Sequence, residues 1–154
     1  MYHFENQVLI SETADKVFDF VDDHARFSSH MSKPSFMMGG GKMKVTLDNK
    51  HGQEVGSHII LSGNVFGINL YLDEVVTERE RPYLKVWKTV GTPKLLVIGN
   101  YQLKIEIKPQ DNKSLLRVSI DYEMPDKNVW LGKFFGGIYA KWCVGQMIEG
   151  VKQV

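Results

Sequence analysis

Residues 115–124 read LLRVSIDYEM, and this stretch shows the clearest structural pattern in the chain. Apolar side chains fall at every second position, namely Leu116, Val118, Ile120, Tyr122 and Met124. Polar or charged side chains lie between them, at Arg117, Ser119, Asp121 and Glu123. A period of two places alternate side chains on opposite faces of a strand. The stretch therefore predicts a β-strand with one buried and one solvent-facing side, which Pro125 ends.

Similar alternation extends through most of the upstream chain. Residues 42–124 predict six strands in succession, at 42–47, 53–61, 68–77, 83–90, 95–107 and 116–124. Turn-forming residues separate them, at 48–52, 62–67, 78–82, 91–93 and 109–113. An earlier strand is predicted over residues 2–10, and two short helices follow it, the first capped by Ser11 or Thr13 and the second beginning near Asp22 or Asp23. Consecutive strands joined by hairpins predict an antiparallel sheet.

The C-terminal region, residues 129–151, contains no proline and predicts one long helix. Its apolar side chains do not share one face. A wide arc holds Trp130, Leu131, Phe134, Phe135, Ile138, Tyr139 and Trp142, and a different side holds Val144, Met147, Ile148 and Val151. Gly132, Gly136, Gly137 and Gly145 each weaken helix formation by up to ~1 kcal/mol relative to alanine. We therefore expect a helix that is bent, loosened or divided into two segments.

The composition limits the class of protein. The chain has 154 residues, of which 43% are hydrophobic, and its net charge is +1. A chain of this length buries about 70% of its unfolded surface, so residues 1–154 predict a single domain with its own core. The near-zero charge argues against a dedicated nucleic-acid binder. A single cysteine, Cys143, precludes an internal disulfide, and no basic leader or long apolar span is evident, so we expect a cytoplasmic location.

The predicted order is a strand, two short helices, six strands and a long helix, which is an α+β architecture. Four blocks of sequence resemble the START-like superfamily, also called SRPBCC, and in particular its polyketide cyclase/dehydrase and lipid-transport-like members. These blocks are VLISETADKVFDFVDDHARFSSHM at 8–31, EVGSHIILSG with LDEVVTERERPYLKVW at 54–87, YQLKIEIKP with LLRVSIDYEMP at 101–125, and LGKFFGGIYAKWCVGQMIEGVKQV at 131–154. The resemblance covers essentially the whole chain.

The resemblance implies the helix-grip fold, in which a seven-stranded curved antiparallel sheet wraps around the C-terminal helix. It also implies an internal cavity for a hydrophobic or amphipathic molecule. Members of the superfamily include lipid carriers, hormone receptors, aromatases or cyclases and chaperone cofactors, so the fold does not determine the function.

Candidate ligand-binding residues combine apolar positions of the strands, the second short helix and the C-terminal helix with methionines near the glycine-rich segment 39–42. Those methionines are either an apolar lip over the cavity or ordinary core filling. The set comprises Phe27, Met31, Met38, Ile59, Leu70, Trp87, Tyr101, Tyr122, Phe135, Ile138, Tyr139 and Trp142.

Candidate catalytic residues are His58, Tyr101 and Tyr122. His58 lies out of phase with the apolar positions of its strand, which favours a solvent-facing side chain over an acid or base in the cavity. Tyr101 and Tyr122 fall in the apolar register, so their hydroxyls either enter the cavity or reach water at its edge. His24 and His30 are six residues apart and the chain has no HExxH motif, so no metal site is predicted.

These observations lead to one main functional hypothesis and one alternative. The main hypothesis is that the protein binds a hydrophobic or amphipathic small molecule or lipid without a cofactor, and that this binding serves transport or sequestration. The alternative is a polyketide cyclase/dehydratase-like enzyme that uses polar residues in the same cavity. Lys133 and Lys141 flank the aromatic part of the helix and could touch a membrane surface, but a solvated face is the commoner role of such lysines. The oligomeric state is not predicted.

Overall fold

The computed structural model describes residues 1–27, 42–65 and 67–154. The chain begins with β1 (Tyr2–Ile10), α1 (Ala14–Asp22) and α2 (His24–Phe27). Six strands follow: β2 (Lys42–Leu47), β3 (His58–Val65), β4 (Ile68–Glu80), β5 (Leu84–Lys94), β6 (Tyr101–Gln110) and β7 (Lys113–Tyr122). The C-terminal helical region consists of α3 (Val129–Leu131), the π-helical turn η3 (Gly132–Gly136) and α4 (Gly137–Lys152). The α+β prediction and its order of elements are confirmed.

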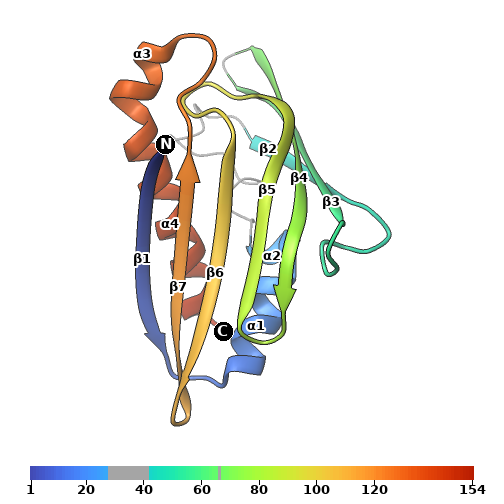
Figure 1. Ribbon diagram of the computed structural model, residues 1–154, viewed down its shortest axis with the longest axis vertical. Coiled ribbons are helices and arrows are strands. Elements are labelled where there is room, and N and C mark those ends of the chain that lie inside the picture. Colours follow the sequence, from blue (N-terminus) through green and yellow to red (C-terminus); the bar gives the residue numbers. More distant parts are fainter. Residues whose placement is uncertain (28–41, 66) are drawn as a thin grey trace.

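The strands form one seven-stranded antiparallel sheet in the order β1-β7-β6-β5-β4-β3-β2. The first strand pairs with the last, with Tyr2 opposite Tyr122 and Ile10 opposite Ser114. Helices α1, α2 and α4 lie against one face of the sheet, and α4 runs along β1 and β7 (Figure 1). No helix in the described part of the chain is long and apolar enough to cross a membrane.

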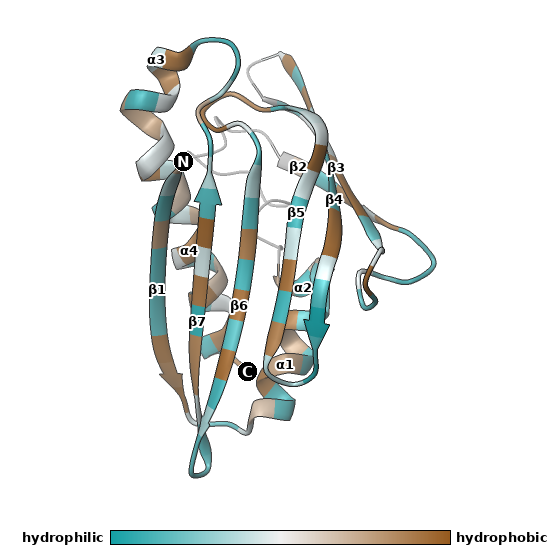
Figure 2. Cartoon of the chain, viewed as in Figure 1, coloured by the Kyte–Doolittle hydropathy of each residue, from teal (hydrophilic) through white to brown (hydrophobic). Residues whose placement is uncertain are grey.

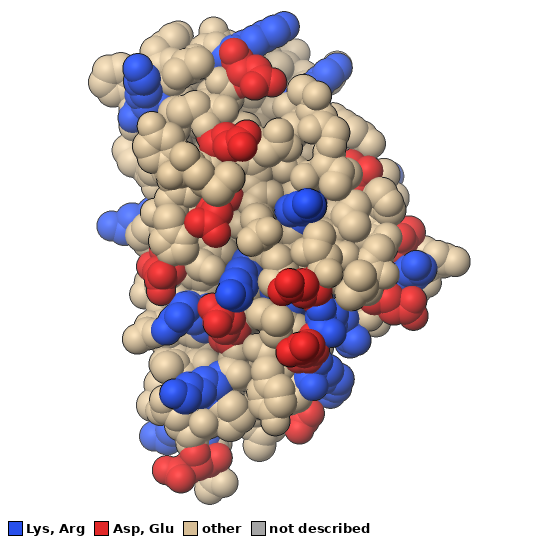
Figure 3. Space-filling view, viewed as in Figure 1, with Lys and Arg blue, Asp and Glu red and all other residues tan. Residues whose placement is uncertain are grey.

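The core lies between the inner face of the sheet and the helices. Brown and teal alternate along the strands in Figure 2, in agreement with the period of two in the sequence. The pattern is regular in β7, where Leu116, Val118 and Ile120 are buried while Arg117 is exposed. On the face shown in Figure 3, basic and acidic side chains are interspersed. The outer surface of the sheet therefore presents no field of one sign on this side.

Several predicted strand boundaries were wrong. The third strand begins at His58 instead of 53, because the Asp48 carboxylate and the Ser57 hydroxyl hold the preceding residues in a loop. The fifth runs through Pro93 to Lys94, where a break was expected. The sixth begins at Tyr101, and residues 95–100 form a connection over the end of the cavity. Pro93 is tolerated because that end of β5 has no partner in β6, whose pairing stops at Lys88.

Of the three expected forms of the C-terminal helix, the structure shows the loosened one: residues 129–152 are continuously helical, with the π-helical turn η3 between α3 and α4. Its buried face is formed by Ala140, Val144, Met147, Ile148 and Val151. The aromatic arc of its first half is largely solvent-exposed, since Trp130, Phe134, Phe135 and Ile138 are 48–70% exposed. The sheet covers the second half of the helix, so apolar character alone did not identify the inward face.

Candidate functional site

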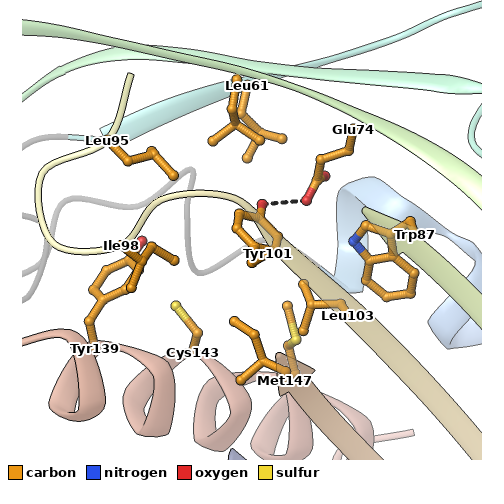
Figure 4. A pocket seen from close by; sticks show the side chains of 12 residues that line it. Leu61, Glu74, Trp87, Leu95, Ile98, Tyr101, Leu103, Tyr139, Cys143 and Met147 are labelled. Atoms are coloured by element: carbon orange, nitrogen blue, oxygen red, sulfur yellow. Dashed lines mark hydrogen bonds between the residues drawn. The ribbon is translucent and has the colours of Figure 1, made fainter. Parts of the chain in front are cut away.

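A small cavity lies between the inner face of the sheet and α4. Its volume is about 40 Å³. Most of its wall is apolar, and the residues come from β3, β4, β5, β6, β7, α4 and the 95–100 connection (Figure 4). The described lining residues are Leu61, Leu72, Glu74, Trp87, Leu95, Ile98, Tyr101, Leu103, Ile120, Tyr139, Cys143 and Met147. A space of this size holds one or a few water molecules, whereas a benzene-binding cavity measures about 150 Å³.

The polar part of the wall is a carboxylate held by a tyrosine. Glu74 shares the inner face of β4 with Leu70, Leu72 and Val76, and only 2% of its surface is exposed. Tyr101, on β6, donates a short hydrogen bond from its hydroxyl to Oε2 of Glu74 (Figure 4). The hydrogen bond fixes one carboxylate oxygen and keeps the pair at the edge of the cavity.

The other polar groups of the wall remain neutral at physiological pH. Burial raises the pKa of Tyr101 well above its ordinary value, and the negative charge of Glu74 raises it further. Burial also raises the pKa of Tyr139 well above the ordinary value and that of the Cys143 thiol to about 12. Cys143 is therefore a protonated thiol beside the Tyr139 hydroxyl, not an activated nucleophile.

Next to the cavity, a cluster of buried charges ties the end of α1 to the sheet. Arg79 donates two hydrogen bonds to the carboxylate of Asp22, at 3.2 Å and 2.7 Å. The ammonium of Lys85, a fully buried residue of β5, lies 3.1 Å from the same carboxylate. Burial lowers the pKa of Lys85, and the charge of Asp22 opposes that shift. Asp22 thus pairs with two cations, and the charge of Glu74 also raises the pKa of Lys85.

His24 lies between this cluster and the cavity wall. Its ring is 1% exposed, packs edge-on against Trp87 at 5.1 Å and places Nε2 3.6 Å from Oε1 of Glu74. Among the residues that the structure describes, neither ring nitrogen has a hydrogen-bond partner. The distance to Glu74 is too long for a direct hydrogen bond, so both groups retain unused polar capacity.

The structure brings only part of the predicted ligand-binding set to the cavity. Trp87, Tyr101 and Tyr139 line it. Five other members belong to the same core outside the lining, being buried or partly buried: Phe27, Ile59, Leu70, Tyr122 and Trp142. Phe135 and Ile138 were placed wrongly, since they are 48% and 56% exposed on the outer side of the helix. Met31 and Met38 lie outside the described residues.

Two of the three catalytic candidates are displaced from the cavity. His58 is exposed and pairs with Asp73 at 3.0 Å on the outer face of the sheet. The ring of Tyr122 is buried and stacks on Tyr2, at 5.6 Å between centroids, without reaching the cavity. Of the three catalytic candidates, only Tyr101 contributes a polar group to the cavity wall.

The sequence analysis missed Glu74, Asp22, His24 and Lys85. For Glu74 and Lys85, the alternation of the strands contained the information needed to place them. Glu74 falls in register with Leu72 and Val76, and Lys85 in register with Trp87, so alternation alone assigns both to the inner face. Asp22 falls four residues after the buried Phe18, on the apolar face of α1, but a charged residue at a helix end was not interpreted as buried. His24 carried no such signal, because a helix of four residues is too short to show which side faces the sheet. In the described ranges no group of three His, Cys, Asp or Glu side chains could hold a metal ion.

Comparisons with known proteins identify the fold. No family model and no curated protein matches the sequence. Solved structures do match over 99% of the chain, among them the Thermus thermophilus protein TTHA0849, with a TM-score of 0.70, 10% identity and 95% of that chain covered. Norcoclaurine synthase from Thalictrum flavum matches with a TM-score of 0.65, 15% identity and 91% coverage of its chain. Major latex-like protein 151 from Panax ginseng matches with a TM-score of 0.63, 13% identity and 95% coverage of its chain.

These identities are too low to carry function across, but the agreement over nearly full length is an agreement of architecture. The curved seven-stranded sheet, the two short helices after β1 and the long C-terminal helix occur here in the same order. The protein therefore has the helix-grip fold that its sequence blocks indicated.

Proposed function

We propose that the protein binds a hydrophobic or amphipathic small molecule in the cavity between the sheet and α4. The observation that carries this proposal is an apolar cavity with a hydrogen-bonded carboxylate, Glu74, set in one wall. Ligand sites in proteins combine a mostly apolar lining with a few placed polar groups. A purely structural core has no need for a buried carboxylate beside a histidine that has no hydrogen-bond partner among the described residues, because each unsatisfied group costs about 1–3 kcal/mol.

The cavity volume limits how binding occurs. At about 40 Å³, the space is far below the 300–1,000 Å³ typical of sites for drug-sized ligands. A ligand of more than a few heavy atoms has to displace part of the wall. Residues 95–98 are the natural part to move, because Leu95 and Ile98 line the cavity from outside the strands, whereas backbone hydrogen bonds to Glu123 hold Gly99 and Asn100. We therefore expect tight selection for small or slender molecules.

One structural neighbour supports a small-molecule role for this fold. Norcoclaurine synthase from Thalictrum flavum has been solved in complex with dopamine and hydroxybenzaldehyde. At 13% identity the likeness concerns the architecture alone, so the ligands of that enzyme set no expectation for this chain.

The proposal includes a cytoplasmic location, which the lone cysteine fits.

Cys143 supplies a built-in test, because the only cysteine of the chain lies in the cavity wall. A ligand in the cavity should slow the reaction of its thiol with a disulfide reagent and raise the melting temperature. Both effects should grow with ligand excess, since stabilisation reaches about 2.7 kcal/mol at 100 times Kd. Native mass spectrometry of freshly purified protein would reveal a retained ligand. No retained mass, together with no protection by any member of a panel of small apolar compounds and lipids, would refute the proposal.

A matched pair of variants tests whether the ligand that protects Cys143 lies in this cavity. Leu61→Phe adds volume to the cavity wall, whereas Ile60→Phe adds the same kind of side chain one position away on the outer face of β3. We expect Leu61→Phe to weaken ligand protection of Cys143 by about tenfold or more, and Ile60→Phe to leave it unchanged. Equal effects of both variants would place the ligand elsewhere.

The alternative, a cyclase/dehydratase-like enzyme without a cofactor, retains one specific supporting observation. Glu74 and Tyr101 are two polar groups that meet at the cavity wall, as proton transfer to and from a bound substrate requires. With His58 on the outer face, Glu74 is the better base. Incubation with aromatic polyketide-like substrates should then give a product that Glu74→Gln abolishes while binding persists. Binding without turnover in the wild-type protein favours the carrier.

A further inference from the structure

The charge of the cavity wall points to the chemistry of its ligand. Of the twelve described lining residues, Glu74 is the one with a carboxylate, and the raised pKa values of the two tyrosines and Cys143 keep those groups protonated at neutral pH. The other eight are apolar side chains. The described wall of the cavity is therefore an apolar surface with one carboxylate group.

The nearby cations do not present their charge to the cavity. The ammonium of Lys85 lies 3.1 Å from the Asp22 carboxylate, and Arg79 donates two hydrogen bonds to the same carboxylate. Neither lysine nor arginine appears among the described lining residues. The ammonium of Lys85 also interacts with the charge of Glu74, which raises the pKa of Lys85. Of these charged residues only Glu74 is among the described lining residues, so it is the one that a ligand in the cavity meets.

Glu74 also has acceptor capacity to spare. A carboxylate offers about four lone-pair sites. Within the described chain its hydrogen bond comes from Tyr101, which occupies Oε2. Oε1 faces Nε2 of His24 at 3.6 Å, a separation beyond hydrogen-bond range, and that nitrogen is itself unpartnered. The described lining therefore offers acceptors on the Glu74 carboxylate and contains no lysine or arginine that would pair with an acidic ligand.

We infer that the ligand is a small apolar amine, whose ammonium group donates hydrogen bonds to Glu74 while its hydrocarbon body contacts the leucine and aromatic wall. This inference rests on the proposed function and narrows its ligand class. Charge-assisted hydrogen bonds in a low-dielectric site are stronger than neutral ones. A carboxylate ligand, including a fatty acid, would instead bring a second negative charge beside Glu74.

The test compares head groups on identical hydrocarbon bodies. Butylamine, butanol and butyrate, and 2-phenylethylamine, 2-phenylethanol and phenylacetate, are titrated into the wild-type protein at pH 7, with chemical-shift perturbation and Cys143 protection as readouts. We expect the amine to bind about tenfold more tightly than the matching alcohol, and the carboxylate to bind more weakly than both. A tenfold difference corresponds to about 1.4 kcal/mol.

A pair of charge-removing variants tests the role of Glu74. Glu74→Gln keeps the size of the side chain and an acceptor for Tyr101, and it should bring the amine-to-alcohol ratio close to one. Asp73→Asn removes a carboxylate from the preceding residue of β4, which lies on the outer face beside His58. This variant should leave the amine-to-alcohol affinity ratio unchanged. Circular dichroism verifies that both variants are folded.

The outcomes separate the inference from the proposed function. Alcohols that bind as well as amines, or carboxylates that bind best, overturn the inference and leave small-molecule binding intact. An amine preference that survives Glu74→Gln equally overturns it. Binding of none of the six compounds, with no protection of Cys143 by the wider panel, removes the proposed function and the inference together.

Discussion

Asp22 is the residue on which the buried charges depend. Its carboxylate sits at the end of α1, 6% exposed, and joins that helix to Arg79 on β4 and Lys85 on β5. Burial alone would raise its pKa, but the hydrogen bonds from Arg79 and the charge of Lys85 outweigh burial and hold the pKa below its ordinary value. Removing one cation leaves a pair in balance, whereas removing Asp22 leaves two cations without their counter-ion.

This asymmetry predicts different costs for two substitutions. Asp22→Asn should lower the free energy of unfolding by about 3–5 kcal/mol, the typical cost of breaking a buried ion pair from one side. Lys85→Met should cost much less, because Asp22 keeps both hydrogen bonds from Arg79 and an apolar side chain replaces a desolvated charge. Urea denaturation at pH 7 measures both. Equal losses would mean that Lys85, and not only Arg79, is needed to balance Asp22.

Among the elements, the C-terminal helix depends on glycine in a way that helix propensity does not capture. A Cβ atom at Gly132 would lie 2.5 Å from Cδ of Pro125 and 2.8 Å from Sδ of Met124. The missing side chain lets η3 pack closely against the segment that follows β7. At Gly145, in α4, a Cβ would meet nothing within 4 Å. The first glycine is required by packing and the second is not.

The two alanine substitutions should therefore change stability in opposite directions. Gly132→Ala should destabilise the protein, by about 1–3 kcal/mol as is usual for overpacking, because its neighbours have to shift. Gly145→Ala should stabilise it by up to ~1 kcal/mol, since alanine favours the helix and finds open space. Chemical denaturation of both variants and the wild type checks the signs. A destabilised Gly145→Ala variant would contradict this account of α4.

At the same scale, the sequence predicts strands better than it predicts the inward face of the helix. A strand has two faces, so the alternation of Leu116, Val118 and Ile120 settles which side is buried. The helix has apolar groups around much of its circumference, and only the position of the sheet decides that Val144 is buried while Phe135 is exposed. The cavity follows from that tertiary choice. Glu74 was within reach of the alternation rule, but a charged residue in an apolar register was not interpreted as inward-facing.

Two carboxylates with lowered pKa values, Asp22 and Asp48, make the stability of the molecule sensitive to acid. Asp22 anchors α1 to the sheet, and Asp48 accepts hydrogen bonds from the Ser57 hydroxyl at 2.6 Å and the His58 amide at 2.8 Å, which close the loop before β3. The hydrogen bond from Ser57 lowers the pKa of Asp48 from its ordinary value of 3.8, and the backbone amide of His58 adds to the effect. Both carboxylates are thus more acidic in the folded protein than in the unfolded chain.

This sign determines how stability depends on pH. A carboxylate with a lowered folded-state pKa contributes its full stabilisation above the unfolded-state value, and that contribution is lost as pH falls through the folded-state value. The free energy of unfolding should therefore be nearly constant down to about pH 5 and decline below it. Asp48→Asn should be less stable than the wild type at pH 7, and the difference should shrink as the pH falls through the folded-state pKa of Asp48, because the wild-type carboxyl then also becomes neutral. Urea denaturation across this range measures both curves, and curves that stay parallel to low pH would show that Asp48 does not couple the loop to the sheet through its charge.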